Sequence, residues 1–146
     1  MTDSQSLRLV FLSAAVHERL VAHVADELRR AGYADVTPSK LSFLGALDCG
    51  VNYGADIARQ LNVSRQLVAR TVKELCLAGY LEQVAGPGKQ KQILFTAAGE
   101  RLMAAVRQQL AHVDGRLHQR VGEAALTQTL SVLGAVTEAI ETRDGR

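Results

Sequence analysis

The sequence contains few aromatic residues and little proline. Its 146 residues include no Trp, three Phe, three Tyr and two Pro. Because so few large rings are present, Leu, Val and Ala must build the hydrophobic core, and this composition favours helices. The hydrophobic content of 47% and the charged content of 22% are ordinary for a globular protein, which argues against a disordered chain. The length predicts a single domain spanning residues 1–146.

Cysteine, clustered histidine and long apolar runs are also scarce. Cys49 and Cys76 alone cannot form a disulfide framework or a metal-ligand cluster, and the four His are not spaced as ligand pairs on one helix face. We therefore expect no metal and no cofactor. No apolar run reaches about 18 residues, so no membrane span is expected. Residues 1–6 lack the order of a signal peptide, which predicts a reduced cytoplasmic protein.

Enzyme signatures are missing as well. The sequence has no glycine-rich phosphate-binding loop, no nucleophile elbow and no metal-protease helix, so a non-enzyme is expected. The net charge of +2 is too small to indicate a nucleic-acid partner, but the charge is unevenly distributed. Residues 54–96 contain six basic and three acidic residues, a net charge of +3. Positive charge concentrated in one segment is what contacts with phosphate groups require.

Both ends of the chain show the apolar spacing of long helices. Residues 7–30 carry two neighbouring apolar stripes, which predicts a helix that is buried on two sides and ends at Gly32. The first stripe consists of Leu12, Val16, Leu20, Val24 and Leu28. Residues 97–143 predict two further helices, interrupted at Gly122. Such helices, with little local partner surface, favour a homodimer formed through residues 7–31 and 97–143, and residues 144–146 are expected to fray.

The middle of the chain predicts three shorter helices. Thr37–Pro38 is suited to begin a helix that ends at Gly50, and Ile57, Ala58 and Leu61 mark a short third helix. Ser64 is suited to cap a fourth helix, which ends at Gly79. The buried side of this fourth helix is formed by Val68, Val72 and Leu75.

Residues 80–96 change to the shorter period of extended chain. Residues 80–84 and 92–96 predict two strands, and the seven-residue loop 85–91 between them contains Gly and Pro. A loop of this length is expected to be mobile, and Thr96 is suited to cap the helix that follows. The predicted fold class is mainly α with a small β-hairpin wing: a winged helix-turn-helix lobe at 37–96 between long N- and C-terminal dimerisation helices.

Residues 57–72 have the spacing of a helix-turn-helix. Ala58 is small enough for two helices to cross closely, Asn62 tolerates the left-handed conformation of a tight turn, and Val63 fills the angle between the helices. The spacing leaves a set of residues at the start and on the outer face of the second helix: Ser64, Arg65, Gln66, Ala69, Arg70 and Lys73.

These residues have the chemistry of DNA recognition. Arg makes bidentate contacts with guanine and Gln with adenine, and a small Ala can approach a thymine methyl group. Ser64 and the first backbone amides can hold a phosphate at the positive end of the helix. Lys89 and Lys91, at the tip of the predicted hairpin, add two further cations. The alternative interpretation of the pattern is a solvated basic helix face.

The whole pattern resembles the MarR family of bacterial transcriptional regulators, and the resemblance covers nearly all of the chain. It rests on the order and spacing of Thr37–Pro38, Ile57–Ala58, Leu61–Ser64, Val68–Leu75, Gly79–Leu81 and Phe95–Gly99. The resemblance implies a homodimer in which the first, fifth and sixth helices pair the subunits. It also implies that the fourth helix enters the major groove and the wing reaches the minor groove. Many relatives release DNA on binding a small, often aromatic, anionic molecule, and others respond to cysteine oxidation.

Two departures from the family pattern matter. The family wing usually carries Asp and, two residues later, Arg, whereas this sequence has Pro87–Gly88–Lys89. Lys cannot form the planar fork of Arg, so Lys89 is expected to contact phosphate rather than to insert into the minor groove. Oxidation-sensing relatives place the reactive Cys near the start of the chain, where this sequence has none. Cys49 and Cys76 are expected to be buried and inert.

We therefore expect a dimeric, sequence-specific regulator of transcription that reads a palindromic operator in double-stranded DNA. It is expected to be a repressor that a small aromatic or anionic effector releases. Two alternatives remain open: a winged-helix protein-interaction module without direct DNA readout, and a DNA-binding regulator without an effector. For an effector pocket, His17 on the first helix is the main candidate. Phe43, Tyr33 and Tyr53 are further candidates, although such residues are more often plain core or loop packing.

Overall fold

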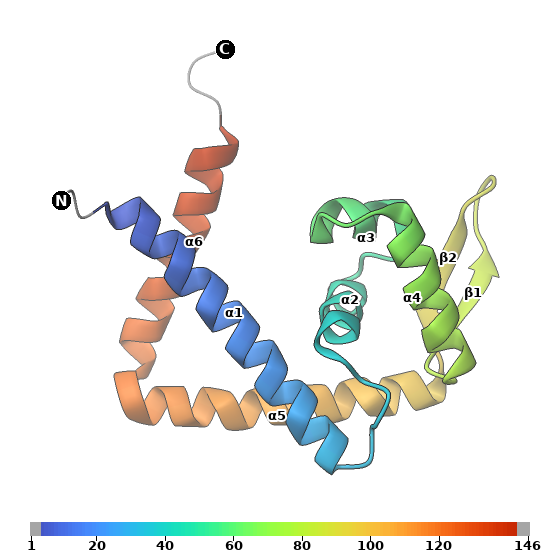
Figure 1. The fold of residues 1–146 in the computed structure, drawn as a ribbon, viewed down its shortest axis with the longest axis horizontal. Coiled ribbons are helices and arrows are strands. Elements are labelled where there is room, and N and C mark those ends of the chain that lie inside the picture. Colours follow the sequence, from blue (N-terminus) through green and yellow to red (C-terminus); the bar gives the residue numbers. More distant parts are fainter. Residues whose placement is uncertain (1–3, 143–146) are drawn as a thin grey trace. The chain divides into compact units, whose positions relative to one another are not determined.

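The computed structural model describes residues 4–142, which form six helices and one two-stranded antiparallel sheet (Figure 1). In chain order the elements are α1 (Gln5–Arg30), α2 (Pro38–Asp48), α3 (Gly54–Leu61), α4 (Arg65–Leu77), β1 (Leu81–Ala85), β2 (Lys91–Phe95), α5 (Ala97–Val121) and α6 (Glu123–Glu141). The predicted class, mainly α with a small β-hairpin, is confirmed. The chain divides into two compact units, Met1–Gln109 and Leu110–Arg146, with the boundary inside α5. None of the described helices is long and apolar enough to cross a membrane.

Most helices begin and end where the sequence predicts, because local backbone chemistry sets these positions. The Thr37 hydroxyl accepts a hydrogen bond from the Lys40 N–H at 3.3 Å, and Pro38 is the first residue of α2. α1 begins two residues earlier than predicted, since the Ser4 hydroxyl accepts a hydrogen bond from the Leu7 N–H. The four glycines predicted to end or interrupt helices all have positive φ: Gly32, Gly50, Gly79 and Gly122. The predicted fraying of residues 144–146 lies outside the described residues.

The two strands lie one residue nearer their turn than the sequence predicts. β1 and β2 pair from Leu81 opposite Phe95 to Ala85 opposite Lys91. The prediction of strands at 80–84 and 92–96 was therefore wrong by one residue in each strand. The connecting loop is correspondingly shorter and consists of residues 86–90 rather than 85–91.

Hydrogen bonds at both ends of the hairpin explain this shift. The Gly86 N–H donates to the Gln90 carbonyl oxygen at 3.1 Å, which continues the pairing past Ala85. At the other end the Tyr80 N–H donates to the Leu75 carbonyl oxygen, so Tyr80 belongs to the turn that closes α4. Only Lys89 of the two predicted tip lysines lies in the loop.

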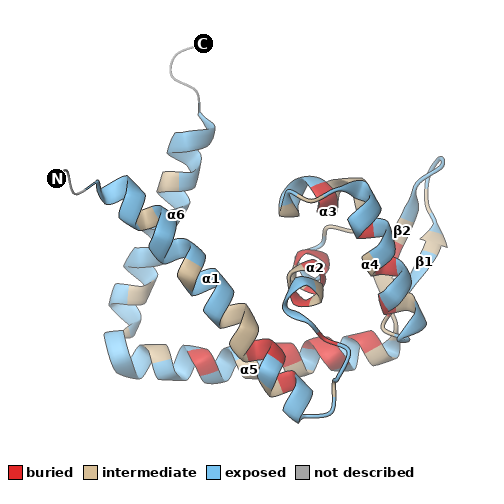
Figure 2. Ribbon diagram, in the orientation of Figure 1, coloured by how far each residue is buried: buried red, intermediate tan, exposed pale blue. Residues whose placement is uncertain are grey.

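The core of the first unit is built around α2, which is apolar on most of its circumference (Figures 1 and 2). Its buried side chains are Leu41, Phe43, Leu44, Ala46 and Leu47. They share one hydrophobic cluster with Val24, Ala25 and Leu28 of α1 and with Leu102, Met103 and Val106 of α5. The C-terminal half of α1 and the start of α5 are therefore integral parts of the core that supports α3 and α4.

The N-terminal half of α1 is apolar but exposed in the single chain. Its large exposed side chains are Leu7, Val10, Phe11, Leu12 and Val16, with 55–66% of each accessible to solvent. α6 has no buried residue, and it exposes Leu130, Val132, Leu133 and Ile140. The prediction that the first helix is buried on two sides is thus not fulfilled within one chain at this end.

A tight backbone contact holds the start of α5 against the end of α4. The Thr96 N–H donates to the Tyr80 carbonyl oxygen, and the Thr96 hydroxyl donates to the Gly79 carbonyl oxygen. The Thr96 hydroxyl also accepts a hydrogen bond from the Gly99 N–H at 3.1 Å, which confirms Thr96 as the cap of α5. Gly99 is buried, and a Cβ atom added there would overlap the Tyr80 carbonyl oxygen. Only glycine allows α5 to begin this close to the turn that ends α4.

We predict that Gly99→Ala lowers the free energy of unfolding by about 1–3 kcal/mol, because the added methyl group must displace backbone. Gly45→Ala is the matched control, since a Cβ at that helical position meets no atom within 4 Å. The control is expected to be neutral or to gain up to about 1 kcal/mol from helix propensity. Urea denaturation measures both, and equal stabilities of the two variants would contradict the prediction.

Candidate nucleic-acid interface

α3 and α4 are joined by the tight turn of a helix-turn-helix. Asn62 has φ 54° and ψ 49°, and it is the only non-glycine residue with positive φ in the described part of the chain. The Val63 N–H donates to the Ala58 carbonyl oxygen at 3.0 Å. Ala58 is buried, and half-buried Val63 packs against the same core. The predicted roles of Ala58, Asn62 and Val63 in this turn are confirmed.

α4 is capped at its start and anchored along one side. The Ser64 hydroxyl accepts a hydrogen bond from the Leu67 N–H at 3.1 Å, and Val68, Val72 and Leu75 are at most 4% exposed. Because a helix repeats every 3.6 residues, burying this side turns the opposite side to solvent. The residues exposed there are the predicted set: Arg65, Gln66, Ala69, Arg70 and Lys73.

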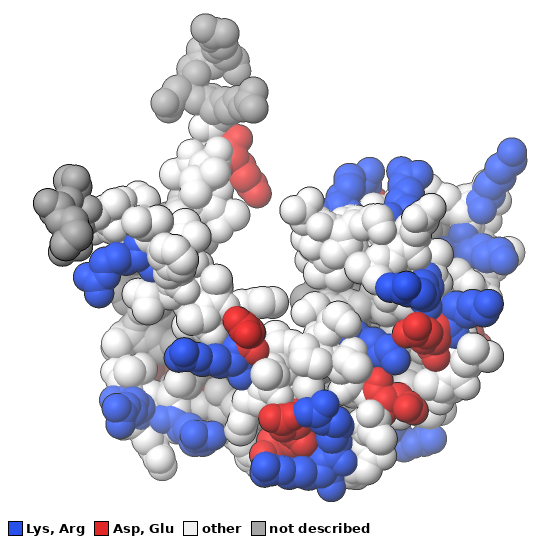
Figure 3. Space-filling view, viewed as in Figure 1, with Lys and Arg blue, Asp and Glu red and all other residues white. Residues whose placement is uncertain are grey.

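Five basic side chains are exposed on α4 and the hairpin. Within residues 4–142, no salt bridge involves Arg65, Arg70, Lys73, Lys89 or Lys91. Lys and Arg side chains gather over α4 and the hairpin (Figure 3). A surface that keeps several cations without partners attracts anions, and its attraction weakens as salt increases.

An ion pair ties α4 to α2. The Lys40 Nζ lies 3.5 Å from a carboxylate oxygen of Glu74, and it also donates to the Asp35 carbonyl oxygen at 3.3 Å. Lys40 is mostly buried, with 19% of its side chain exposed. The pair therefore neutralises the one acidic residue of α4 and links that helix to α2.

A short segment before α3 pairs with β2, and the sequence did not reveal this contact. The Ile93 N–H donates to the Asn52 carbonyl oxygen at 2.8 Å, and Tyr53 forms an isolated antiparallel bridge with Gln92. Two residues before a helix give no periodic signal, so the sequence predicts no role for Asn52 and only pocket lining or packing for Tyr53. The exposed Lys89 and Lys91 extend from a hairpin that this segment supports.

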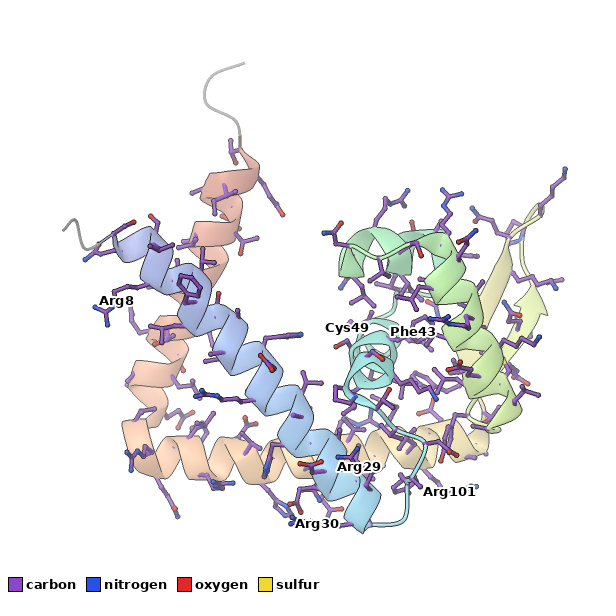
Figure 4. The ribbon with its side chains drawn as sticks, viewed as in Figure 1. Arg8, Arg29, Arg30, Phe43, Cys49 and Arg101 are labelled. Atoms are coloured by element: carbon purple, nitrogen blue, oxygen red, sulfur yellow. The ribbon has the colours of Figure 1, made fainter. Side chains whose placement is uncertain are left out.

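A cleft of about 750 Å³ lies inside the first unit, behind the exposed face of α4. Its wall is formed by residues of α1, α2, α3 and α4 and of the turn between α3 and α4: His17, Glu18, Val21, Ala22, Pro38, Ser39, Ser42, Phe43, Gln60, Leu61, Val63, Leu67, Val68 and Thr71. His17 and Phe43 therefore do border a cleft, whereas Tyr33 and Tyr53 do not. Phe43, on α2 (Figure 4), is 2% exposed and part of the core. This residue therefore both lines the cleft and packs in the core.

The two cysteines differ from the prediction that both are buried. Cys49 follows the last residue of α2 and is exposed (Figure 4). Cys76 is half-buried, and burial raises the pKa of its thiol, which keeps it protonated and less reactive. The described residues hold no group of three His, Cys, Asp or Glu placed to bind a metal ion.

Comparison with known proteins gives matches in structure but not in sequence. No protein-family model matches the chain, and no curated protein matches it. A MarR family transcriptional regulator from Rhodococcus sp. RHA1 is 18% identical, with a TM-score of 0.74 over 92% of this chain and 96% of that one. Apo MarR from E. coli is 16% identical, with a TM-score of 0.71 over 93% and 98%.

A third similar structure is a complex. S. aureus MepR bound to DNA is 17% identical, with a TM-score of 0.69 over 95% of this chain and 99% of that one. At these identities the likeness is one of fold, and it extends over nearly the whole length of each chain. This chain therefore has the winged-helix fold of the MarR family transcriptional regulators.

Proposed function

We propose that the chain is a DNA-binding regulator of transcription that reads duplex DNA with α4. The observation that carries this proposal is the exposed face of α4, whose cations form no salt bridge within residues 4–142, while the opposite face is buried in the core. The same fold in a DNA complex, that of MepR, supports it. An α-helix with one free side and a capped start fits the width of the major groove.

Each part of the surface has a proposed task. Arg65, Gln66 and Arg70 contact base edges, and Ala69 lets the helix approach them closely. Ser64 and the first amides of α4 bind a phosphate at the positive end of the helix. Lys73, Lys89 and Lys91 contact further phosphates, since Lys acts as a point charge rather than a planar fork. Phosphate contacts position the protein, and base contacts select the sequence.

Selection of bound sequences from a random DNA pool tests the proposal and supplies a probe for variants. With the selected duplex, Arg70→Ala is expected to weaken binding by about 1–3 kcal/mol and to relax the base preference at one position. Arg30→Ala is the matched control, because Arg30 is exposed at the far end of α1 (Figure 4). Fluorescence anisotropy measures both affinities.

The outcome also decides between DNA readout and the alternative of a protein-interaction module. If Arg70→Ala and Lys73→Ala bind DNA as tightly as the unmodified chain, α4 does not read the operator. Affinity should also fall steeply as salt is raised, because cations that replace counterions on phosphate dominate such binding. A flat response to salt would argue for the interaction module.

We further propose that the chain acts as a homodimer. The exposed apolar side chains of the N-terminal half of α1 and of α6 are too numerous for surfaces left in water. A symmetric dimer buries both helices and presents two copies of α4 to successive half-sites, about 34 Å or one DNA turn apart. The selected operator should then be a palindrome with that spacing.

Leu12→Asp is expected to shift the protein toward monomer, because it places a charge in the proposed apolar interface. Leu77→Asp introduces the same charge at a side chain of α4 that is 80% exposed, and it should leave the dimer intact. Analytical ultracentrifugation separates the two states. A chain that sediments as a monomer at all concentrations, yet binds the full palindrome tightly, would rule out this assembly.

The third part of the proposal is repression relieved by a small aromatic effector in the cleft. Leu67, Val68 and Thr71 belong to α4 and also line the cleft, so an occupant there touches the recognition helix from behind. Most of the lining is apolar, and Pro38 and Ser39 bring the positive end of α2 to it. An aromatic molecule with an anionic group directed at α2, and away from Glu18, fits this wall.

A panel of small aromatic acids should therefore contain compounds that raise the melting temperature and weaken operator binding. A ligand at 100 times its Kd stabilises a protein by about 2.7 kcal/mol. Ser42→Leu, which fills the cleft beside half-buried Ser42, should abolish the thermal shift but keep operator affinity. If aromatic acids still release Ser42→Leu from the operator as they release the unmodified chain, the effector binds elsewhere. Operator binding that no compound weakens would favour the effector-independent regulator.

A further inference from the structure

The segment before α3 is bound to the hairpin by two hydrogen bonds to a single residue. The Ile93 N–H donates to the Asn52 carbonyl oxygen at 2.8 Å, and the Asn52 side-chain amide donates to the Ile93 carbonyl oxygen at 3.2 Å. Ile93 is 1% exposed, so these bonds anchor the inner strand of the hairpin at a buried point. Each hydrogen bond contributes more to stability at a buried site than at the surface, because loss of either partner leaves a polar group that water cannot reach.

Tyr53 extends this contact toward the turn of the hairpin. It bridges Gln92, and its ring lies against Gly86, the first residue of the turn. A Cβ placed on Gly86 would be 3.5 Å from the ring Cε1 and 3.6 Å from the hydroxyl oxygen, which is ordinary contact distance. Tyr53 and Gly86 are both half-buried, although the turn beyond them is exposed.

The same residue begins the helix-turn-helix. The Tyr53 carbonyl oxygen accepts hydrogen bonds from the N–H groups of Asp56 and Ile57, each at 3.1 Å, and Tyr53 is the N-cap of α3. Its backbone is thus fixed to α3 while its ring touches the hairpin turn. A two-stranded hairpin alone is only marginally stable, so an additional support decides how firmly its tip is held.

We propose that Tyr53 is the positioning residue of the wing. Together with Asn52, it holds the turn that carries Lys89 in a set place relative to α3 and α4. This inference rests on the proposed function, because the wing matters only if Lys89 and Lys91 contact phosphate. Tyr53 acts through the hairpin and not by touching DNA. A rigidly held lysine loses less entropy when it binds, which increases the affinity that it contributes.

The first experiment measures the wing without DNA. Hydrogen–deuterium exchange of Tyr53→Ala should show at least several-fold faster exchange of the Gly86 and Ile93 amides, with the amides of α2 and α5 unchanged. Tyr53→Phe keeps the ring against Gly86 and should exchange like the unmodified chain. Unchanged protection of Gly86 and Ile93 in Tyr53→Ala would overturn the proposal, and so would a uniform loss of protection across the core.

The second experiment is a double-mutant cycle with the selected operator. Tyr53→Ala should weaken binding about three- to tenfold in the normal chain, through the loss of wing contacts with phosphate. In a background with Lys89→Ala and Lys91→Ala, the same change should have no further effect. An equal loss in both backgrounds would show that Tyr53 touches DNA directly or acts on the whole fold, and it would overturn the proposal.

The two experiments separate this inference from the function on which it rests. If the unmodified chain binds no DNA, the proposed function fails, while hydrogen exchange still decides whether Tyr53 holds the hairpin. If the chain binds DNA and Tyr53→Ala binds as well as Tyr53→Phe, the function stands and the positioning role fails.

Discussion

The structure of the proposed DNA-binding surface depends on the burial of one side of α4. Val68, Val72 and Leu75 are at most 4% exposed, and burying each side chain contributes about 1.5–3 kcal/mol. That energy fixes the rotation of the helix about its own axis. Once the rotation is fixed, the 3.6-residue repeat leaves the arginines of α4 no position except the solvent face. The Lys40–Glu74 pair adds a second restraint on the same helix.

The other proposed features attach to α4 from two sides. The cleft lies behind it and shares Val68, so the residue that anchors the helix also borders the proposed effector site. The hairpin lies beyond its C-terminal end and is held by Asn52 and Tyr53, which precede α3. A displacement of α3 would therefore carry the wing with it. The proposed reading helix and wing thus share a common support, and a change at that support affects both.

Much of the fold was predictable because its signals are local. Thr37, Ser64 and Thr96 each cap a helix through a hydrogen bond to an amide three residues later, and a short polar side chain suffices for that contact. Asn62 adopts the left-handed conformation that its position in the turn requires. The buried side of α4 followed from apolar spacing alone. The ends of the two strands were missed by one residue, because Ala85 and Lys91 carry no hydrophobic pattern that marks the end of pairing.

The sequence by itself determined the order of the elements, the helix termini and the set of cations that α4 exposes, since each depends on residues within a few positions of one another. Tertiary structure alone decided which distant residues meet. Residues 52 and 53 became an edge of the hairpin through contacts with residues some 40 positions later, and four separate helices enclosed the cleft. The exposure of Cys49, just after the end of α2, was likewise decided by tertiary packing. Such contacts join residues that are far apart in the sequence, and residue spacing within a short segment cannot predict which of them will meet.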